Sequence, residues 1–378
     1  MNRRSFLRLA GGGVILAAGA TTLFATTRTP TQALAPWGQA GAYADPRMSA
    51  LSYAILAPNP HNRQPWIVSL EGDDALTLYF DTGKQLPHTD PFDRQLTIGM
   101  GCFLELMRMA AEANGYLTET MLFPEGSDTN GLDGRPIAHV QFQKSDSTAD
   151  PLWAHVMNRR SNKEPFDTAR PVEAAALDRI LSVARYGTLG GSVDPASIAE
   201  WRRLSSDALR IEIETPHTFK ESVDLFRIGK AEVNANPDGI DFSGPLFEAM
   251  ALTGVMTREA TLDTSSTAFN EGMKAVLANS ETAMGHLWLI TPANTREDQI
   301  ATGADWLRVN LACTAEGLSF QPLSQALQEY PEMDALYRET HRRLAPAGGT
   351  VQMLARIGYG PDIAPSPRWP IESKIGTA

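Results

Sequence analysis

The first strong hydrophobic pattern in the body of the chain has helical spacing. Apolar residues that share one helix face recur at Met48, Leu51, Ile55 and Leu56. The pattern stops before Pro58, because a proline disfavours the helical conformation of the residue that precedes it. We therefore predict a helix from Met48 to Leu56 that leads directly into a loop.

A different periodicity follows the loop. Residues 67–70 and 76–80 are rich in β-branched, aromatic and leucine side chains, and the turn residues around Gly72 and Asp73 separate them. Such runs on either side of a turn predict two strands. Further on, residues 102–113 are apolar on nearly every side, which predicts a helix that is buried all round.

The buried helix has a counterpart 202 residues later in the chain. Residues 93–116 and 295–318 place the same kinds of side chain at matching positions. Each segment ends in a small-residue-rich helix followed by a glycine, Gly115 or Gly317, which suits the left-handed position after a helix. The matching pairs are Ile98 with Ile300, Gly101 with Gly303, Leu104 with Trp306, Met107 with Val309, Ala110 with Ala312, and Ala113 with Ala315.

The two copies also have similar surroundings, since a predicted helix and predicted strands precede each of them. The economical interpretation is an α+β fold in which two related α/β sandwich halves are fused in one chain. We predict the first half at residues 45–150 and the second at 151–378, with its opening helix at about 173–184. Residues from about 219 to 282 form an extra segment of mixed polarity, as expected for a lid or a surface excursion.

The first 35 residues have a different character. They contain no acidic residue, and their apolar run is too short and too rich in glycine for a comfortable membrane span. The string from Asn2 to Arg8, NRRSFLR, resembles a twin-arginine export signal, which directs folded proteins out of the cytoplasm. The resemblance implies a leader over residues 1–35, the twin-arginine export machinery as a partner, and a periplasmic or exported location.

Two aspects of this leader stay open. A short amphipathic or anchoring N-terminus would have a similar composition. Small-x-small sequences that suit cleavage occur at 33–35, just before a proline, and at 42–44. A leader that stays uncleaved would tether the protein to a membrane.

The charge and the cysteine count exclude several classes of protein. The formal net charge is −11, and removal of the first 35 residues with their four arginines leaves 29 basic and 44 acidic side chains, close to −15. A surface for nucleic acid needs clustered Lys and Arg, so we expect no nucleic-acid partner. Cys102 and Cys313 are the two cysteines, which excludes a disulfide scaffold and a four-cysteine metal site but allows one disulfide.

A short basic motif could bind a phosphate group. Arg159, Ser161 and Lys163 stand at alternate positions. In an extended or turning segment alternate side chains share one face, so that two cations and a hydroxyl could contact the same anion. An isolated motif of this kind is more often a solvated basic patch.

The residues around the motif favour the functional interpretation. Phe166, Pro171-Val172 and Leu177 follow it, and residues 57–66 read Ala-Pro-x-x-x-Asn-x-Gln-Pro-Trp. Together these stretches resemble the two signature segments of the nitroreductase family of flavin enzymes. The resemblance extends to the buried repeat helix and to three later segments: Gly317-Leu318, Arg356-Ile357-Gly358 and Ser366-Pro367-Arg368-Trp369-Pro370.

The order of the two motifs is unusual. In an ordinary nitroreductase the phosphate motif precedes the loop, and two chains pair to build two flavin sites. Here the loop lies in the first half and the phosphate motif in the second, while residues 184–187 stand where the second half would carry its own loop. One composite site per chain follows, and the chain resembles the fused, pseudo-dimeric Acg-type branch of the family. A monomer is therefore expected to be sufficient.

The resemblance also implies roles for individual residues. The cofactor would be FMN. Its phosphate would be held by Arg159, Ser161, Lys163 and Arg368, with Arg160 beside them. Its ring and ribityl chain would contact Pro58, Asn59, Pro60 and Asn62, although Ser or Gly is common in the family where Asn59 and Pro60 stand. Groups near the reactive flavin nitrogen would come from Pro322, Leu323, Ser324 and Gln325, whereas Gln64 and Trp66 would be structural.

Two functions fit this site. In the first, an FMN-dependent oxidoreductase exchanges electrons or hydride by a ping-pong mechanism with a small-molecule acceptor such as a nitroaromatic or a quinone, and no side chain acts as a catalytic acid or base. The electron donor is unidentified, because free NAD(P)H is not expected outside the cytoplasm. In the second, a catalytically weak protein stores or sequesters FMN under the lid-like insertion.

Other chemistries have little support in the sequence. The seven histidines show no metal-ligand spacing. Gly99-x-Gly101 lacks the third glycine of a dinucleotide-binding loop, and no Gly-x-Ser-x-Gly motif is present. Cys102 and Cys313 fall in apolar helices and are expected in the core. His61 would lie in the flavin loop, either beside the ring or as a hydrogen-bonding residue that fixes the loop.

Overall fold

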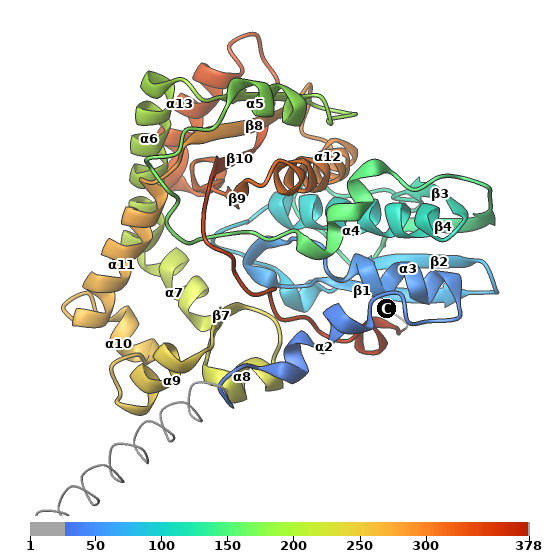
Figure 1. Cartoon of the computed structure of the whole chain (residues 1–378), viewed down its shortest axis with the longest axis horizontal. Helices are drawn as coiled ribbons and strands as arrows, with labels where there is room; N and C mark the ends of the chain where they lie inside the picture. The colour runs from blue at the N-terminus through green and yellow to red at the C-terminus, as the bar shows by residue number, and fades with distance from the viewer. Residues whose placement is uncertain (1–26, 377–378) are drawn as a thin grey trace, which may run out of the picture.

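The computed structural model describes residues 27–376, and the twin-arginine string predicted from Asn2 to Arg8 lies outside them. Two four-stranded antiparallel sheets and a pair of long central helices dominate the chain (Figure 1). The predicted α+β class and the two related halves are confirmed.

The first half follows the predicted pattern closely. Its hairpin pairs Glu71 with Ala75 around Gly72, which adopts a positive φ of 51° that suits a glycine. The strand order is β1-β2-β4-β3. The elements are α3 (Pro46–Ala54), η1 (Pro60–Asn62), β1 (Trp66–Glu71), β2 (Ala75–Phe80), η2 (Thr82–Lys84), α4 (Arg94–Ala113), β3 (Tyr116–Leu122) and β4 (Pro136–Lys144).

The second half repeats this topology. Its sheet has the order β5-β8-β10-β9, so that in both halves the first, second, fourth and third strands lie side by side. The elements are η3 (Pro151–Asn158), α5 (Ala174–Leu181), β5 (Thr188–Ser192), α6 (Pro195–Glu214), β8 (Gly285–Thr291), α12 (Arg296–Ala315), β9 (Ser319–Pro322), η4 (Gln325–Leu327), η5 (Pro331–Met333), α13 (Asp334–Leu344), β10 (Thr350–Gly358) and η6 (Ile371–Lys374).

Reciprocal contacts join the two central helices, α4 and α12. A Cβ atom on Gly101 would overlap the carbonyl group of Ile300, and one on Gly303 would overlap the carbonyl group of Ile98. These four residues are the pairs that the sequence repeat matches. The sequence repeat therefore corresponds to the contact between α4 and α12, which has approximate twofold symmetry. Each copy presents the same surface to the other.

One hydrophobic core extends across both halves. It includes Trp66 and Phe103 of the first half and Trp306 of the second. Cys102 and Cys313 are buried and free, so the disulfide that the sequence allowed is not formed. Burial raises the pKa of Cys102 to about 12, which keeps this thiol protonated and supports its assignment to the core.

The predicted insertion at 219–282 is largely helical and flanks α6 along one side of the molecule (Figure 1). It begins within α7 and ends just after α11. The elements are α7 (Pro216–Asp224), β6 (Phe226–Ile228), α8 (Gly229–Ala235), β7 (Ile240–Phe242), α9 (Pro245–Leu252), α10 (Arg258–Leu262) and α11 (Thr267–Ser280).

Both ends of the described chain pack on the first half. The predicted leader boundary at residue 35 falls inside helix α2 (Thr31–Gln39), whose Ala33 and Trp37 are buried. The C-terminal segment leaves the second half, and Ile375 forms a parallel β-bridge with Val68 of β1 (Figure 1). The boundary predicted at residue 151 therefore does not separate the contacts of the two halves. Within residues 27–376, no helix combines the length and the apolar character needed to cross a membrane.

Candidate functional site

The loop between α3 and β1 is held in an unusual conformation. His61, Asn62 and Gln64 all have positive φ, between 47° and 53°. The side chain of Asn59 supports this shape, because its Oδ1 accepts a hydrogen bond of 2.7 Å from the backbone N–H of Gln64. Asn59 and Pro60 lie close to α4 at Gly99, where a Cβ would come within 3.2 Å of both. The close approach of this loop explains why residue 99 is a glycine.

Gln64 and Trp66 are structural, as the sequence predicts. Gln64 is fully buried, donates through Nε2 to the carbonyl of Pro237 at 2.6 Å and accepts from the N–H of Trp369 at 2.9 Å. Trp66 packs against Phe103 in the core. One side chain thereby ties the loop to the insertion and to the C-terminal segment.

Arg159 and Arg368 converge on the start of the same loop. Arg159 follows η3 and donates from Nη2 to the carbonyl of Leu56 at 2.9 Å. Arg368 donates from Nη2 to the carbonyls of Leu56 and Ala57, both at 3.1 Å, and from Nη1 to Oδ1 of Asn62. These contacts join the phosphate motif, the predicted flavin loop and the C-terminal segment in one place.

Arg160 lies beside this pair. Its guanidinium stacks over the ring of Trp37, 4.9 Å from the centroid, and Arg368 lies 5.9 Å from the same centroid. Trp37 in turn donates from Nε1 to the carbonyl of Ser366 at 2.8 Å. Helix α2 therefore covers the arginines from the side opposite the loop, as a cation–π partner.

The arginine cluster has an excess of positive charge. Arg159 and Arg368 are 4% and 3% exposed, and neither they nor Arg160 pairs with a carboxylate within the described residues. Burial, followed by repulsion from Arg160, lowers the pKa of Arg159 to about 10. Burial and then repulsion from Arg159 and Arg160 lower the pKa of Arg368 to about 9. Burial is the first cause of both shifts, and no carboxylate of the described residues is among the groups that offset it.

Lys163 occupies the far end of the motif. Its side chain is exposed, yet surrounding protein atoms lower its pKa, and Glu212 and Asp241 partly offset this. His61 faces the same region, since burial and then Lys163 and Arg63 lower its pKa to about 4 and keep it neutral. A residue of the first half and a residue of the second half thus lie within electrostatic range. This proximity tests neither role suggested for His61, which were a position beside the flavin ring and a hydrogen bond that fixes the loop.

The segment from Arg159 to Lys163 is anchored along its backbone. Ser161 is half-buried, and the N–H of Asn162 bonds to the carbonyl of Phe320 in β9 at 2.8 Å. Arg356 is fully buried and donates to the carbonyl of Lys163 at 3.2 Å. The motif therefore runs beside the strand that leads to Pro322.

Residues 322–325 form the turn between β9 and η4. Pro322 and Gln325 are half-buried, and Leu323 and Ser324 are buried. Ser324 fixes the turn, because its Oγ accepts a hydrogen bond of 3.1 Å from the N–H of Leu354. Leu323 packs against Leu209 of α6. This turn therefore contacts α6.

Four residues near the candidate site were not identified from the sequence: Trp37, Asn310, Pro237 and Glu212. Trp37 lies two residues beyond the predicted leader, and Asn310 lies in the second copy of the repeat helix. In the amide orientation that satisfies both of its ends, Asn310 accepts from Arg159 Nη1 at 3.2 Å and donates to the carbonyl of Arg160 at 3.1 Å. Asn310 is one of several buried polar residues of α12, so no single polar position in the sequence indicated it.

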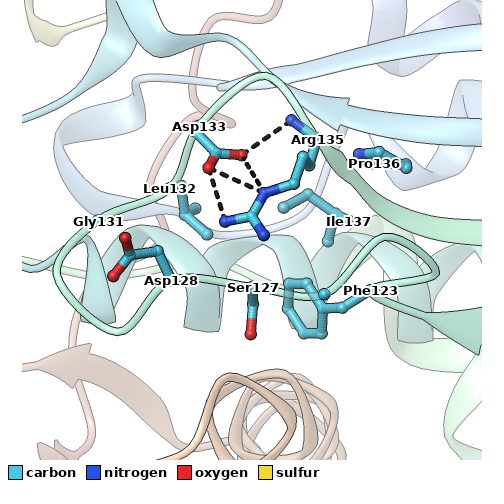
Figure 2. Close-up of a pocket in the computed structure, with 10 residues that line it drawn as sticks. Phe123, Ser127, Asp128, Gly131, Leu132, Asp133, Arg135, Pro136 and Ile137 are labelled. Atoms are coloured by element: carbon cyan, nitrogen blue, oxygen red, sulfur yellow. Dashed lines mark hydrogen bonds and ion pairs between the residues drawn. The ribbon is translucent and has the colours of Figure 1, made fainter.

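A small pocket lies elsewhere, under the loop between β3 and β4. Its volume is about 10 Å³, which is room for roughly one water molecule. Figure 2 shows that Arg135 pairs with Asp133 at its rim. None of the predicted cofactor-binding residues lines it, so this pocket is not a candidate for a large ligand.

Comparison with known proteins identifies relatives of almost equal length. "Uncharacterized protein Rv3127" of Mycobacterium tuberculosis is 24% identical over 351 residues, which cover 86% of this chain and 92% of the relative. "Putative NAD(P)H nitroreductase acg" of the same species is 25% identical over 338 residues, which cover 86% and 93%. No family model matches the chain.

Solved structures are similar only to part of the chain. The FMN-dependent nitroreductase NfnB from Mycobacterium smegmatis, solved with NADPH, is 19% identical with a TM-score of 0.33, and the match covers 57% of this chain and 92% of that one. A nitroreductase with bound FMN from Bacteroides fragilis is 12% identical with a TM-score of 0.32, and covers 57% and 91%. Two of the relatives in sequence, at 25% and 26% identity, are named putative NAD(P)H nitroreductases.

Proposed function

We propose that this protein is an FMN-dependent oxidoreductase of the nitroreductase type, with one FMN per chain, that transfers electrons or hydride to a small acceptor such as a nitroaromatic or a quinone. The observation that carries the proposal is the cluster of buried Arg159 and Arg368 with half-buried Arg160, none of which has a carboxylate partner among residues 27–376. The named nitroreductase among the relatives supports the same chemistry.

The residues present fit an FMN phosphate. Nε of Arg368 is buried and has no hydrogen-bond partner among the described residues, so this donor could serve a phosphate oxygen. A buried charge without a partner is costly, and a phosphate dianion would compensate two arginines at once. Burial and repulsion between the arginines lower the pKa values of Arg159 and Arg368, and a bound anion would offset both effects.

The residues proposed to contact the cofactor are those that the family resemblance indicates. Arg159, Ser161, Lys163 and Arg368, with Arg160 beside them, would hold the phosphate. The loop residues Pro58, Asn59, Pro60 and Asn62 would contact the ring and ribityl chain from the other half. The turn formed by Pro322, Leu323, Ser324 and Gln325 would lie near the reactive part of the ring.

FMN would supply the redox chemistry, and the side chains would bind, orient and shield it. Three loop residues with positive φ fix the shape of the surface offered by the first half. Trp37 and the C-terminal segment exclude water from the arginines, which strengthens their attraction for an anion. No side chain of the site needs to act as a catalytic acid or base.

Flavin retention tests the proposal. The purified full chain should be yellow with close to one FMN, and Arg159→Ala with Arg368→Ala should lose the flavin, since charge-assisted hydrogen bonds contribute roughly 1.5–3 kcal/mol each. Arg203→Ala is the matched control, because Arg203 is an exposed arginine in α6. Full occupancy in the double variant, or two FMN per wild-type chain, would contradict the composite site.

The electron donor requires a separate experiment. Under anaerobic conditions, bleaching of the flavin by NADH or NADPH would support an enzyme that uses nicotinamides. Bleaching by dithionite alone would support a different donor or a storage role.

One observation favours the second candidate function, an FMN-storage protein. The insertion contacts the predicted flavin loop: Gln64 donates to Pro237, the N–H of Gly239 donates to the carbonyl of Asn62 at 3.2 Å, and Lys84 pairs with Asp238 at 2.5 Å. A segment fixed in this way would restrict access to the ring. Lys84→Ala should accelerate flavin reduction by dithionite if the insertion limits access, and an unchanged rate would count against storage.

We also propose export through the twin-arginine pathway, with the protein either released or tethered by an uncleaved leader. The basis is the string NRRSFLR. Replacement of Arg3 and Arg4 by Lys should retain the protein in the cytoplasm, and unaltered fractionation would reject the proposal. A monomer is expected, because both half-sites lie in one chain, and its mass in solution tests this.

A further inference from the structure

A second polar cluster lies beside the turn at residues 322–325. Glu212, in the last turn of α6, is 9% exposed and adjoins the side chains of Gln325, Gln328 and Ser222. Leu209 stands one helical turn before Glu212 and packs on Leu323, so both residues of α6 face this turn. The hydroxyl of Thr218 donates to the backbone carbonyl of Glu212 at 2.7 Å and joins α7 to the same place.

The cluster contains an unusual concentration of unsatisfied groups. Fourteen buried side-chain atoms of the described residues lack a hydrogen-bond partner, and five of them belong here. Each such atom is costly to bury, so a group of five indicates a partner that completes them. The five atoms are Glu212 Oε2, Ser222 Oγ, Gln325 Oε1, Gln328 Oε1 and the hydroxyl oxygen of Tyr330.

Electrostatic coupling connects this cluster to the proposed flavin site. Lys163 of the phosphate motif feels the charge of Glu212, and Gln325 belongs to the turn assigned to the reactive part of the ring. The cluster therefore lies between the insertion, which provides Ser222, and the predicted cofactor contacts. Gln325 belongs to both sets, whereas Glu212, Gln328, Ser222 and Tyr330 take no part in the cofactor contacts assigned above.

We propose that Glu212, Gln325, Gln328 and Ser222 form a binding subsite for a small neutral molecule that donates hydrogen bonds through a hydroxyl or an amide N–H, with Glu212 as the principal acceptor. That this molecule is a redox substrate rests on the proposed function, whereas the binding itself does not. The two glutamine oxygens can only accept, and Glu212 accepts most strongly when ionised. A ligand with donors at two positions would satisfy several of the five atoms.

The subsite should respond to pH. Burial raises the pKa of Glu212 to about 7, and Glu221 on α7 contributes in the same direction, while Gln328, Gln325 and Ser222 oppose it. The other charged or titratable groups that face it are Lys163 and Tyr330. A donor ligand prefers the carboxylate, so its affinity should rise as the pH passes upward through about 7.

The experiment is calorimetric titration of the full chain with 4-hydroxybenzamide, a redox-inert probe with a hydroxyl and an amide. 4-Methoxy-N,N-dimethylbenzamide, which lacks both donors, is the matched ligand control. Wild type should bind the first probe and not the second. Glu212→Leu and Gln328→Leu should each weaken binding about tenfold or more, the effect of one lost hydrogen bond to a buried charged or polar group.

Glu212→Gln separates a specific role from a structural one. It keeps the shape and the neutral hydrogen bonding, so it should bind the probe with an affinity that no longer changes between pH 6 and pH 8. Glu214→Gln, two residues further along α6 and exposed, should leave both the affinity and its pH dependence unchanged. Equal affinity for the two probes, or a retained pH dependence in Glu212→Gln, would overturn the subsite.

Titrations with and without FMN keep this proposal distinct from the proposed function. Probe binding by a chain that retains no FMN would support the subsite and contradict the flavin assignment. Retention of FMN without any probe binding would do the reverse. Melting curves of the variants show that each one is folded.

Discussion

The loops that follow α3 and α5 occupy corresponding positions in the two halves. They differ in whether the arginine side chains that contact them pair with carboxylates. After α3 the carbonyl of Leu56 accepts hydrogen bonds from Arg159 and Arg368, and no carboxylate of the described residues pairs with either. After α5 the carbonyl of Val183 accepts from Arg308 Nε at 3.0 Å. Arg308, however, has counter-ions within the protein.

In the loop region after α5, carboxylates of the protein itself pair with the arginine side chains. Arg308 pairs with Asp150 at 2.7 Å and with Glu105 at 3.3 Å, and Arg185 pairs with the same Asp150 at 3.0 Å. Asp305 accepts three backbone N–H groups of this loop, from Arg185 to Gly187, which are donors that a ligand would otherwise meet.

Under the proposed function, the duplicated fold would keep one anion site and lose the other. The first region would take an external anion, while the second pairs its arginines with its own carboxylates. Buried charge that a protein leaves uncompensated is therefore a better guide to a ligand here than the repeated fold is. The predictions below test this contrast, starting with the largest effect.

Removal of the internal counter-ions should destabilise the second region strongly. Glu105→Gln with Asp150→Asn leaves Arg308 buried and unpaired, which should cost about 3–5 kcal/mol in the free energy of unfolding. Urea denaturation measures this loss. Addition of Arg308→Met should recover part of it, and phosphate should stabilise the double variant more than wild type. If the double variant unfolds like wild type, the network is not what closes this region.

The arginines of the first region should behave in the reverse manner. Arg159→Met with Arg368→Met should leave the stability of the apoprotein unchanged or increased, because it removes uncompensated buried charge. The same variant should bind FMN at least about a hundredfold more weakly, since two charge-assisted contacts are lost. Fluorescence titration measures the affinity. A large loss of apoprotein stability with normal FMN affinity would reverse the interpretation of the two regions.

The helix contact that joins the halves should be symmetric in its energetics. Gly101→Ala and Gly303→Ala each place a methyl group against the carbonyl of the opposite helix and should cost about 1–3 kcal/mol. Thermal unfolding compares them. Similar losses are expected from the two variants, whereas Gly38→Ala, at an open position of α2, should have little effect. A large difference between the losses of stability in the two variants would show that the helix contact depends mainly on one half.

Acidification should affect the two regions at different pH. The folded-state pKa of His61 is about 4, below its ordinary value of 6.5, so the unfolded chain binds the proton first and stability falls between pH 6.5 and 4. Burial opposes ionisation of Asp150, but Arg308 and its other partners lower its pKa below 3.8, so its contribution is lost only below that pH. His61→Gln should remove the first loss alone. Unfolding measured from pH 7 to pH 3 tests this smallest effect.

The sequence predicted the parts of the molecule that depend on neighbouring residues. The turn after Leu70, the buried helix at 102–113 and the match of Gly101 with Gly303 follow from local conformation and close packing. The positive-φ loop before Trp66 was also marked by its prolines and asparagines. These features lie in short segments whose physical requirements are visible in the order of residues.

The rest depended on partners distant in sequence. Glu105 and Arg308 are 203 residues apart, and nothing local distinguishes them from surface charges. Trp37 was placed near a leader, because its burial depends on Arg160 and on a segment near the other end of the chain. Glu212 sits in an ordinary amphipathic helix, and its role follows from contacts with two glutamines that only the fold brings near.

The contact between the two ends has a consequence for the order of synthesis. Trp37 and Ser366 are 329 residues apart, so at about 5–20 residues per second the first waits roughly 16–66 seconds for the second. During that interval Arg159 has been made, but Arg368 and the C-terminal segment, which contact the same loop, have not. Under the proposed function, FMN would reach the arginines more easily before the last part of the chain is added.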